Sequence, residues 1–198
     1  MKSPPAAEAS IAMRIQMTIP REPSVLLVAG WAAVVAAAMV AGAAVTLFGG
    51  DEDLTAIPAG VPVATSPQKL SEFAATHDRP VYWAGGLAAR KLELTTTREA
   101  TFVRYLPKGV SAGDPRATFT TIATYPLPNA YATAAGRRTQ PGMASRRIPG
   151  GGLAVWSRQK PTSVYVAFRG VPHLVEVYDD RGREALELAL SGRLRPVR

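Results

Sequence analysis

A long uncharged segment near the start of the chain limits what this protein can be. Residues 25–48, with the sequence VLLVAGWAAVVAAAMVAGAAVTLF, contain no charged side chain, and ten of these 24 residues are Val, Leu or Phe. A helix of this length measures about 36 Å, enough to cross a hydrocarbon core of about 30 Å. We therefore predict a transmembrane helix over residues 25–48 that contacts the lipid bilayer.

The charges that flank this segment predict its orientation. Lys2, Arg14 and Arg21 precede it, whereas the acidic run 51–53 follows it. Because Lys and Arg are held on the cytoplasmic side, we expect a cytoplasmic N-terminus and a C-terminal part outside the cell membrane. The alternative is a signal peptide cleaved among the small residues 41–44. The apolar run exceeds the usual h-region, which favours a retained anchor, and both interpretations export the C-terminal part.

Composition divides the rest of the chain into three parts. Residues 1–24 contain four prolines and predict a disordered cytoplasmic tail. Residues 49–65 are rich in Gly, Pro and Ala and predict a linker. Residues 66–198 then form the extracytoplasmic domain. The chain has no cysteine, so an exported domain must be stabilised by its packing, without disulfide bonds.

The pattern of the domain is typical of the α+β class. Strands are expected at 80–84, 91–97, 101–106, 118–125, 145–149, 153–158, 163–169 and 173–179, from their alternation and β-branched residues. Helices are expected from Ser66 to before Pro80, at 130–136 with Asn129 as N-cap, and at 181–191 with Asp180 as N-cap. Runs of strands joined by short turns predict a small, mainly antiparallel sheet with two or three helices packed on one face.

The residue inventory excludes several kinds of site. Without cysteine there is no thiolate nucleophile, Cys-ligated zinc or iron–sulfur cluster, and His77 and His173 are too few for a three-histidine metal site. The glycines 150–152 are not followed by the Lys-Ser or Lys-Thr pair of a phosphate loop, so they predict a turn with positive φ. Glu184 and Glu187 are expected on a solvated helix face, with Arg183 paired to Glu187. We predict no cofactor and no metal.

Four residues carry the only hints of catalysis. Ser66 and Lys69 form an S-x-x-K pattern at a helix start, where penicillin-binding proteins place their nucleophile, but S-D-N and K-T-G are missing. His77 and Asp78 have the residue types of a base and its orienting group. An N-cap serine, a solvated lysine and a structural histidine explain the same residues. A second S-x-x-K, 157–160, lies at a strand end. No catalytic residue is therefore predicted.

Positive charge is concentrated in one part of the domain. The chain has a net charge of +8, and residues 100–160 contain nine Lys or Arg side chains against Asp114 alone. Two arginine pairs bracket a loop, and we predict polyanion binding by Arg137, Arg138, Arg146 and Arg147. The partner would be an anionic envelope polymer, lipid headgroups or an acidic protein; nucleic acid is not expected outside the cell. Ordinary solvated arginines of an alanine-rich chain are the other interpretation.

Short segments of the domain resemble other proteins. These segments are RPVYWAG (79–85), RRIPGGGLAV (146–155), PTSVYVAF (161–168), VEVYD (175–179) and SGRLRPVR (191–198). They are similar to uncharacterised, single-pass, membrane-anchored exported proteins of high-GC bacteria. The resemblance implies an exported single-pass architecture, and it names no activity and no functional residue.

Together these features predict a single-pass membrane protein that presents a non-catalytic extracytoplasmic domain for binding or interaction. The alternative is a membrane-anchored cell-envelope hydrolase that uses Ser66, Lys69, His77 and Asp78. A regulator that signals inward is a third hypothesis, but a 24-residue tail is too short for an effector-binding domain.

Overall fold

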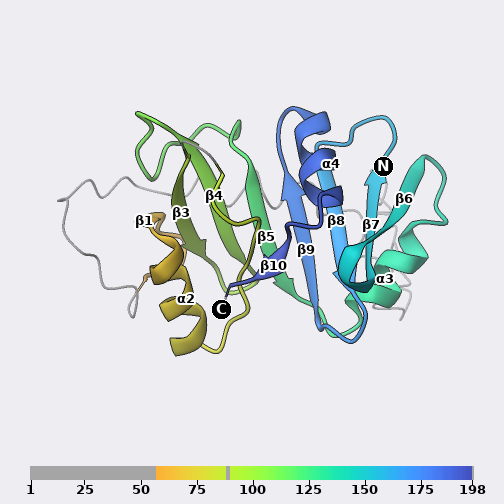
Figure 1. Cartoon of the computed structure of the whole chain (residues 1–198), viewed down its shortest axis with the longest axis horizontal. Coiled ribbons are helices and arrows are strands. Elements are labelled where there is room, and N and C mark those ends of the chain that lie inside the picture. The colour runs from red at the N-terminus through yellow and green to blue at the C-terminus, as the bar shows by residue number, and fades with distance from the viewer. Residues whose placement is uncertain (1–56, 88–89, 198) are drawn as a thin grey trace, which may run out of the picture. The chain divides into compact units, whose positions relative to one another are not determined.

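Eight strands form one antiparallel sheet at the centre of the structure (Figure 1). The computed structural model describes residues 57–87 and 90–197. The strand order is β1-β3-β4-β5-β9-β8-β7-β6, so the sheet joins two meanders side by side. The strands are β1 (Val63–Thr65), β3 (Arg90–Thr96), β4 (Thr101–Pro107), β5 (Thr121–Pro126), β6 (Met143–Ile148), β7 (Gly152–Ser157), β8 (Ser163–Phe168) and β9 (His173–Tyr178).

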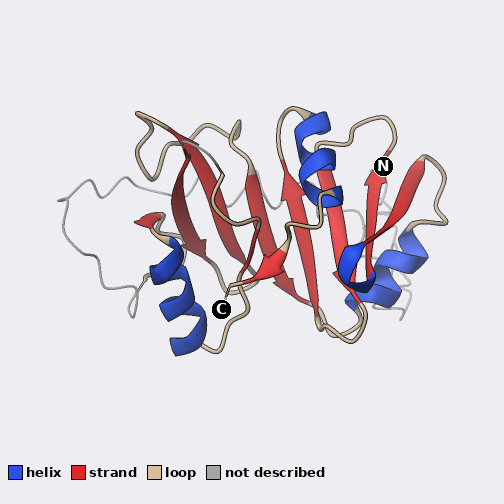
Figure 2. Ribbon diagram, viewed as in Figure 1, coloured by secondary structure: helices blue, strands red, loops and turns tan. Residues whose placement is uncertain are grey.

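Three helices and a two-stranded ribbon complete the described chain (Figure 2). The helices are α2 (Pro67–Thr76), α3 (Ala130–Arg137) and α4 (Gly182–Leu190), and a 3-10 turn, η2, spans Pro149–Gly151. The ribbon pairs β2 (Tyr82–Trp83) with β10 (Arg195–Pro196). This content confirms the α+β class and the antiparallel sheet.

The predicted membrane anchor lies outside the described residues, as do the tail 1–24 and residues 49–56 of the predicted linker. Within the part of the chain that the structure describes, no helix is long and apolar enough to cross a membrane.

One face of the sheet carries the main hydrophobic core. Strand register aligns one apolar side chain from each of five neighbouring strands: Leu94, Val103, Ile122, Val177 and Val164. Buried residues of α2 and α4 and of the β2 segment join them in one cluster. Figure 1 shows α2 and α4 on the near side of the sheet, with β10 between them. We call this side the α2/α4 face.

The third helix packs on the opposite face, which corrects the expectation that all helices share one face. Residues of opposite parity along the strands, such as Tyr165 and Glu176, point away from the main core. The Arg137 guanidinium at the end of α3 lies 4.7 Å from the Tyr165 ring centroid. Since α3 also contacts β7 and β8, this side is the α3 face. Strands that are buried on both faces have nearly continuous apolar sequences instead of alternating ones. The sequence therefore does not show that α3 packs on the second face of the sheet.

The start of α2 follows from its first two residues. Ser66 has an extended backbone, and its Oγ accepts a hydrogen bond from the Lys69 N–H at 3.2 Å. Pro67 occupies the first helical position, where no N–H is needed. Leu70 and Phe73, one turn apart, are buried on the core side. The predicted helix start is confirmed.

Other boundaries differ from the sequence prediction in small ways. Residues 63–65, assigned to the linker, form β1 and pair with β3. Asn129 and Asp180 make no side-chain cap: α4 begins after Arg181, whose N–H binds Asp179 Oδ1. The expected glycine turn is present, with positive φ at Gly150 and Gly151.

A buried ion pair fixes the loop after β4 to the α3 face. Arg104 Nη1 donates to Glu93 Oε1 at 2.7 Å, and both side chains are buried. Glu93 Oε2 accepts from the Gly113 N–H at 2.7 Å. Arg104 Nη2 donates to the carbonyls of Asp114 and Arg116, each at 2.9 Å. The ion pair joins β3 to β4, and the other three bonds tie residues 113–116 to these two strands.

The same loop is stiffened by charge and by an aromatic ring. Arg116 forms an ion pair with Asp114 at 2.8 Å, and the guanidinium holds the pKa of Asp114 at about 2. The Phe119 ring lies within 5.1 Å of the Arg104 guanidinium and 5.2 Å of that of Arg116. The loop therefore presents Ala117 from a defined position.

Candidate functional site

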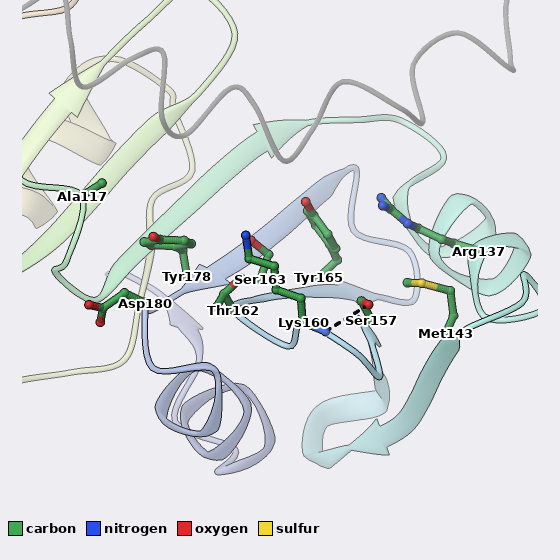
Figure 3. Close-up of a pocket in the computed structure, with 10 residues that line it drawn as sticks. All are labelled: Ala117, Arg137, Met143, Ser157, Lys160, Thr162, Ser163, Tyr165, Tyr178 and Asp180. Atoms are coloured by element: carbon green, nitrogen blue, oxygen red, sulfur yellow. Dashed lines mark hydrogen bonds between the residues drawn. The ribbon is translucent and has the colours of Figure 1, made fainter.

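A pocket of about 600 Å³ opens on the α3 face. Figure 3 shows Arg137 and Met143 at one end and Tyr178 and Asp180 at the other. Residues of the 113–120 loop, the end of α3, and strands β6 to β9 surround it. The lining residues are Ala117, Arg137, Met143, Ser157, Lys160, Thr162, Ser163, Tyr165, Tyr178 and Asp180. This volume is in the range of small-molecule sites.

The pocket combines charge with hydroxyl groups. Arg137 and Lys160 supply two cations against the single carboxylate of Asp180. Ser157, Ser163 and Tyr165 are among the hydroxyl side chains that line it. Such a surface suits a ligand that is itself polar and hydroxylated and that carries negative charge.

Arg137 is held by packing more than by hydrogen bonds. Its guanidinium stacks over Tyr165, and its Nε is buried without a hydrogen-bond partner among the described residues. A buried N–H that lacks an acceptor costs free energy, so the stacking on Tyr165 has to offset that cost. Because Nε itself is buried, a ligand in the pocket would meet other atoms of the Arg137 side chain.

A buried carboxylate lies beside the pocket. Glu176 on β9 is opposite Tyr165 of β8 in the sheet register and is fully buried. Tyr125 Oη donates to Glu176 Oε2 at 2.8 Å, whereas Oε1 has no partner of hydrogen-bonding geometry in the described chain. Burial raises the pKa of Glu176, and the hydroxyls of Ser163, Tyr125 and Tyr165 together with Arg137 partly offset that increase.

The neighbouring phenols respond to the same environment. Burial and the Glu176 charge raise the pKa of Tyr125 and Tyr165, so both phenols are protonated at neutral pH. Next to the pocket, protonated hydroxyls thus surround one buried carboxyl group, and Tyr165 belongs to both this cluster and the pocket lining.

Replacing Glu176 with glutamine is expected to stabilise the domain at neutral pH. Because burial raises the carboxyl pKa, the folded chain binds this proton more tightly than the unfolded chain. The stability that the bound proton of Glu176 contributes is fully present below the unfolded pKa of 4.5. It is lost as the pH rises through the higher pKa that Glu176 has in the folded chain. The gain from E176Q should therefore be absent near the unfolded pKa and grow towards pH 8.

Chemical unfolding of the full chain in detergent, followed by circular dichroism across this pH range, measures the effect. Glu99→Gln, on the exposed β3–β4 turn, is the matched control and should give a flat difference. An E176Q variant that is less stable than the parent at pH 8 would contradict the argument.

The structure separates the four arginines that the sequence grouped together. Arg137 lines the pocket. Arg138 is the exposed C-cap residue of α3. Arg146 and Arg147 are exposed neighbours on the edge strand β6, opposite Ala154 and Leu153 respectively, so they project to opposite faces. Polyanion binding by these residues stays a prediction, and the geometry gives Arg137 the central place in it.

The residues of the hydrolase hypothesis lie at opposite ends of α2. Ser66 is the N-cap and His77 is the C-cap. Ten helical residues separate them, about 15 Å, so they cannot share a hydrogen bond. His77 Nδ1 is 3.1 Å from the Phe73 carbonyl oxygen, and the His77 ring stacks on the Phe73 ring. Asp78 is exposed, and its backbone has a positive φ of 47°.

The second S-x-x-K segment is part of the pocket. Ser157 Oγ accepts a hydrogen bond from the backbone N–H of Lys160 at 3.3 Å (Figure 3). The serine is therefore a turn residue, and it leaves the Lys160 ammonium group on the lining of the pocket.

The remaining candidates have structural partners. Arg183 Nε contacts Glu187 Oε1 at 2.7 Å on the exposed side of α4, as expected for an i,i+4 pair. His173 shares the face of Val175 and Val177, and burial lowers its pKa. Among residues 57–87 and 90–197, no group of three His, Cys, Asp or Glu side chains is placed to hold a metal ion.

Glu176 and Tyr165 were not predicted as site residues, and Lys160 was considered only as part of the second S-x-x-K segment and of the basic region 100–160. A signal for the first was present: Glu176 interrupts a run of apolar and aromatic residues in the strand segment 174–178. A charge inside a central strand must be paired, functional or both. The neighbours that complete the pocket come from segments distant in sequence and emerge only from the sheet order.

No protein family model, curated protein or solved structure was found to match this chain. The resemblance to membrane-anchored exported proteins of high-GC bacteria therefore stays a prediction, and the pocket itself is the basis for assigning a function.

Proposed function

We propose that this chain is a single-pass membrane protein whose extracytoplasmic domain binds an anionic glycan of the cell envelope in the Arg137 pocket, without transforming it. The observation that carries the proposal is the pocket lining, in which two cations stand among hydroxyl side chains. The uncharged segment 25–48 supports the anchoring part of the proposal.

The chemistry of the lining favours this ligand class. Arg137 and Lys160 can pair with the carboxylate or phosphate of an anionic sugar. Ser157 and Ser163 offer hydroxyls that both donate and accept, as sugar hydroxyls require. The ring of Tyr178 supplies an apolar surface for a sugar ring. A purely apolar ligand would leave the two cations desolvated.

Binding of a defined probe tests the pocket. Full-length chain in a neutral detergent is titrated calorimetrically with trigalacturonate, a carboxylated glycan, and with maltotriose, which has hydroxyls but no charge. We expect saturable binding of trigalacturonate, and a loss of affinity of about tenfold or more in Arg137→Gln. Lys160→Gln should weaken binding in the same direction.

Arg98→Gln is the matched control, because it removes one exposed arginine from the β3–β4 turn. It should bind trigalacturonate like the parent. Equal affinity of R137Q, R98Q and the parent, with unchanged circular dichroism, would overturn the assignment of the pocket. Stronger binding of maltotriose than of trigalacturonate would overturn the anionic part.

Topology is tested separately. Alkaline phosphatase and green fluorescent protein are fused to the C-terminus in two separate fusion proteins. The mass of the mature chain without a reporter is measured as well. Export predicts phosphatase activity without fluorescence, and a retained anchor predicts a mass that includes residues 25–48. A fluorescent, phosphatase-inactive fusion would overturn the proposed location.

A further inference from the structure

A second basic site lies on the α2/α4 face, at the C-terminal segment. Arg193, Leu194 and Arg195 alternate: Leu194 is buried in the main core, and both arginines are exposed. Arg195 is opposite Trp83 in the β2–β10 ribbon, and its guanidinium carbon lies 5.8 Å from the Trp83 ring centroid. Burial of Leu194 therefore directs two arginines to the same outer surface.

The two guanidinium groups converge over a glycine. A Cβ built on Gly85 would lie 3.4 Å from Arg195 Nη2 and 3.9 Å from Arg193 Nη2. Arg193 Nη2 also donates to the Gly86 carbonyl at 3.0 Å, which fixes that side chain over the turn. The two Nη2 atoms are thus no more than about 7 Å apart. At this separation two guanidinium charges repel each other even at a solvent-exposed protein surface.

Neither arginine is neutralised within the described chain. No carboxylate of residues 57–87 or 90–197 forms an ion pair with Arg193 or Arg195. Glu184 and Glu187 share a hollow with Arg193, but their ion-pair partners are Arg181 and Arg183. The converged positive charge is therefore left for an external anion.

The backbone beneath the arginines adds donors. Gly85 has a φ of +72°, a left-handed backbone conformation that glycine adopts without steric strain. The N–H groups of Gly85 and Gly86 make no hydrogen bond to any other described residue. Successive amides in a turn of this kind form a concave donor surface for an anion. A hollow of about 710 Å³ beside Trp83 and Arg195 gives room for the rest of a ligand.

We propose that Arg193, Arg195 and the Gly85–Gly86 turn bind a phosphate group. Two guanidinium forks and two amides offer more donors than a planar carboxylate accepts, whereas a tetrahedral phosphate presents oxygens to both arginines at once. The phosphate belongs either to a lipid headgroup or to a soluble phosphate ester. This site is on the opposite face from the Arg137 pocket and does not depend on the proposed function.

Direct binding of labelled phosphate tests the site. Full-length chain in neutral detergent is dialysed to equilibrium against radiolabelled inorganic phosphate. The double variant R193Q/R195Q is expected to bind at least about tenfold more weakly than the parent, and R193K/R195K to fall between them because lysine lacks the planar fork. The control R98Q/R169Q removes two exposed arginines elsewhere and should bind like the parent.

Tryptophan fluorescence locates the bound phosphate. In a W31F/W156F background Trp83 is the one remaining tryptophan, and its emission should change with phosphate unless Arg195 is replaced. Equal phosphate binding by the parent and R193Q/R195Q, with equal melting curves, would overturn the proposal. Saturable binding that leaves Trp83 emission unchanged would also overturn it.

Two further arms identify the source of the phosphate. The Trp83 chain is placed in nanodiscs of phosphatidylcholine, alone or mixed with phosphatidylglycerol. A change in emission that requires phosphatidylglycerol, and that competes with added phosphate, assigns the site to a lipid headgroup. A response to glycerol 3-phosphate that is equal in both nanodiscs assigns it to a soluble ester.

Discussion

Replacement of Arg104 by methionine is expected to destabilise the domain by about 3–5 kcal/mol. The substitution leaves Glu93 fully buried without its ion-pair partner. It also removes the two hydrogen bonds that hold the carbonyls of Asp114 and Arg116. The loop that carries Ala117, one wall of the pocket, should then lose its fixed position, so binding in the pocket should weaken as well.

Guanidinium-induced unfolding of the full chain in detergent measures the loss. The double variant E93M/R104M is the informative control, because it removes both charges from the interior. Apolar replacement of a whole buried pair is close to neutral in other proteins, so we expect it to recover most of the lost stability. A double variant as unstable as R104M alone would show that the hydrogen bonds to the loop, and not the unpaired charge, dominate.

Shortening Ile122 to alanine is expected to cost about 2–5 kcal/mol. Ile122 is fully buried and lies in register between Val103 and Val177, on the strand that joins the two meanders. A cavity there removes contacts on both sides at once, and the flanking strands cannot close over it without breaking the sheet. Ile122→Val, which loses one methylene, should cost about 0.5–1.5 kcal/mol.

The same unfolding experiment compares the two variants with the parent. Ala64→Gly, on the exposed side of β1, serves as a sheet variant outside the core and should cost far less than I122A. A loss of under about 1 kcal/mol for I122A would mean that the core around β5 collapses freely.

Local patterns predicted most elements because each is encoded by adjacent residues. The β3–β4 hairpin follows from two β-branched runs around Arg98 and Glu99, and α2 follows from Ser66 and Pro67. β1 and β10 were not predicted, because strands of three and two residues are too short to show an alternating pattern. Their partners are distant: Arg195 pairs with Trp83, so only the folded chain shows why that segment is extended.

The pocket was harder to predict, for a topological reason. Arg137 was identified from the density of positive charge, which is a property of the sequence. Its contact with Tyr165 depends on α3 crossing to the face opposite α2 and α4, and nothing in the eight residues of α3 specifies that side. Charged residues inside strands, such as Glu93 and Glu176, were the one local sign that the α3 face holds more than packing.

The two terminal strands of the sheet determine how easily a second copy of this domain could pair with it. A sheet ends in unpaired N–H and C=O groups, and a second molecule can extend it strand by strand into a fibril. Here one terminal strand, β1, has three residues, and the other, β6, carries Arg146 and Arg147 on opposite faces. A copy adding to β6 would place its own arginines against these two, above and below the sheet. Pairing of two β6 strands in that register would bring like charges together, which disfavours growth of the sheet at this edge.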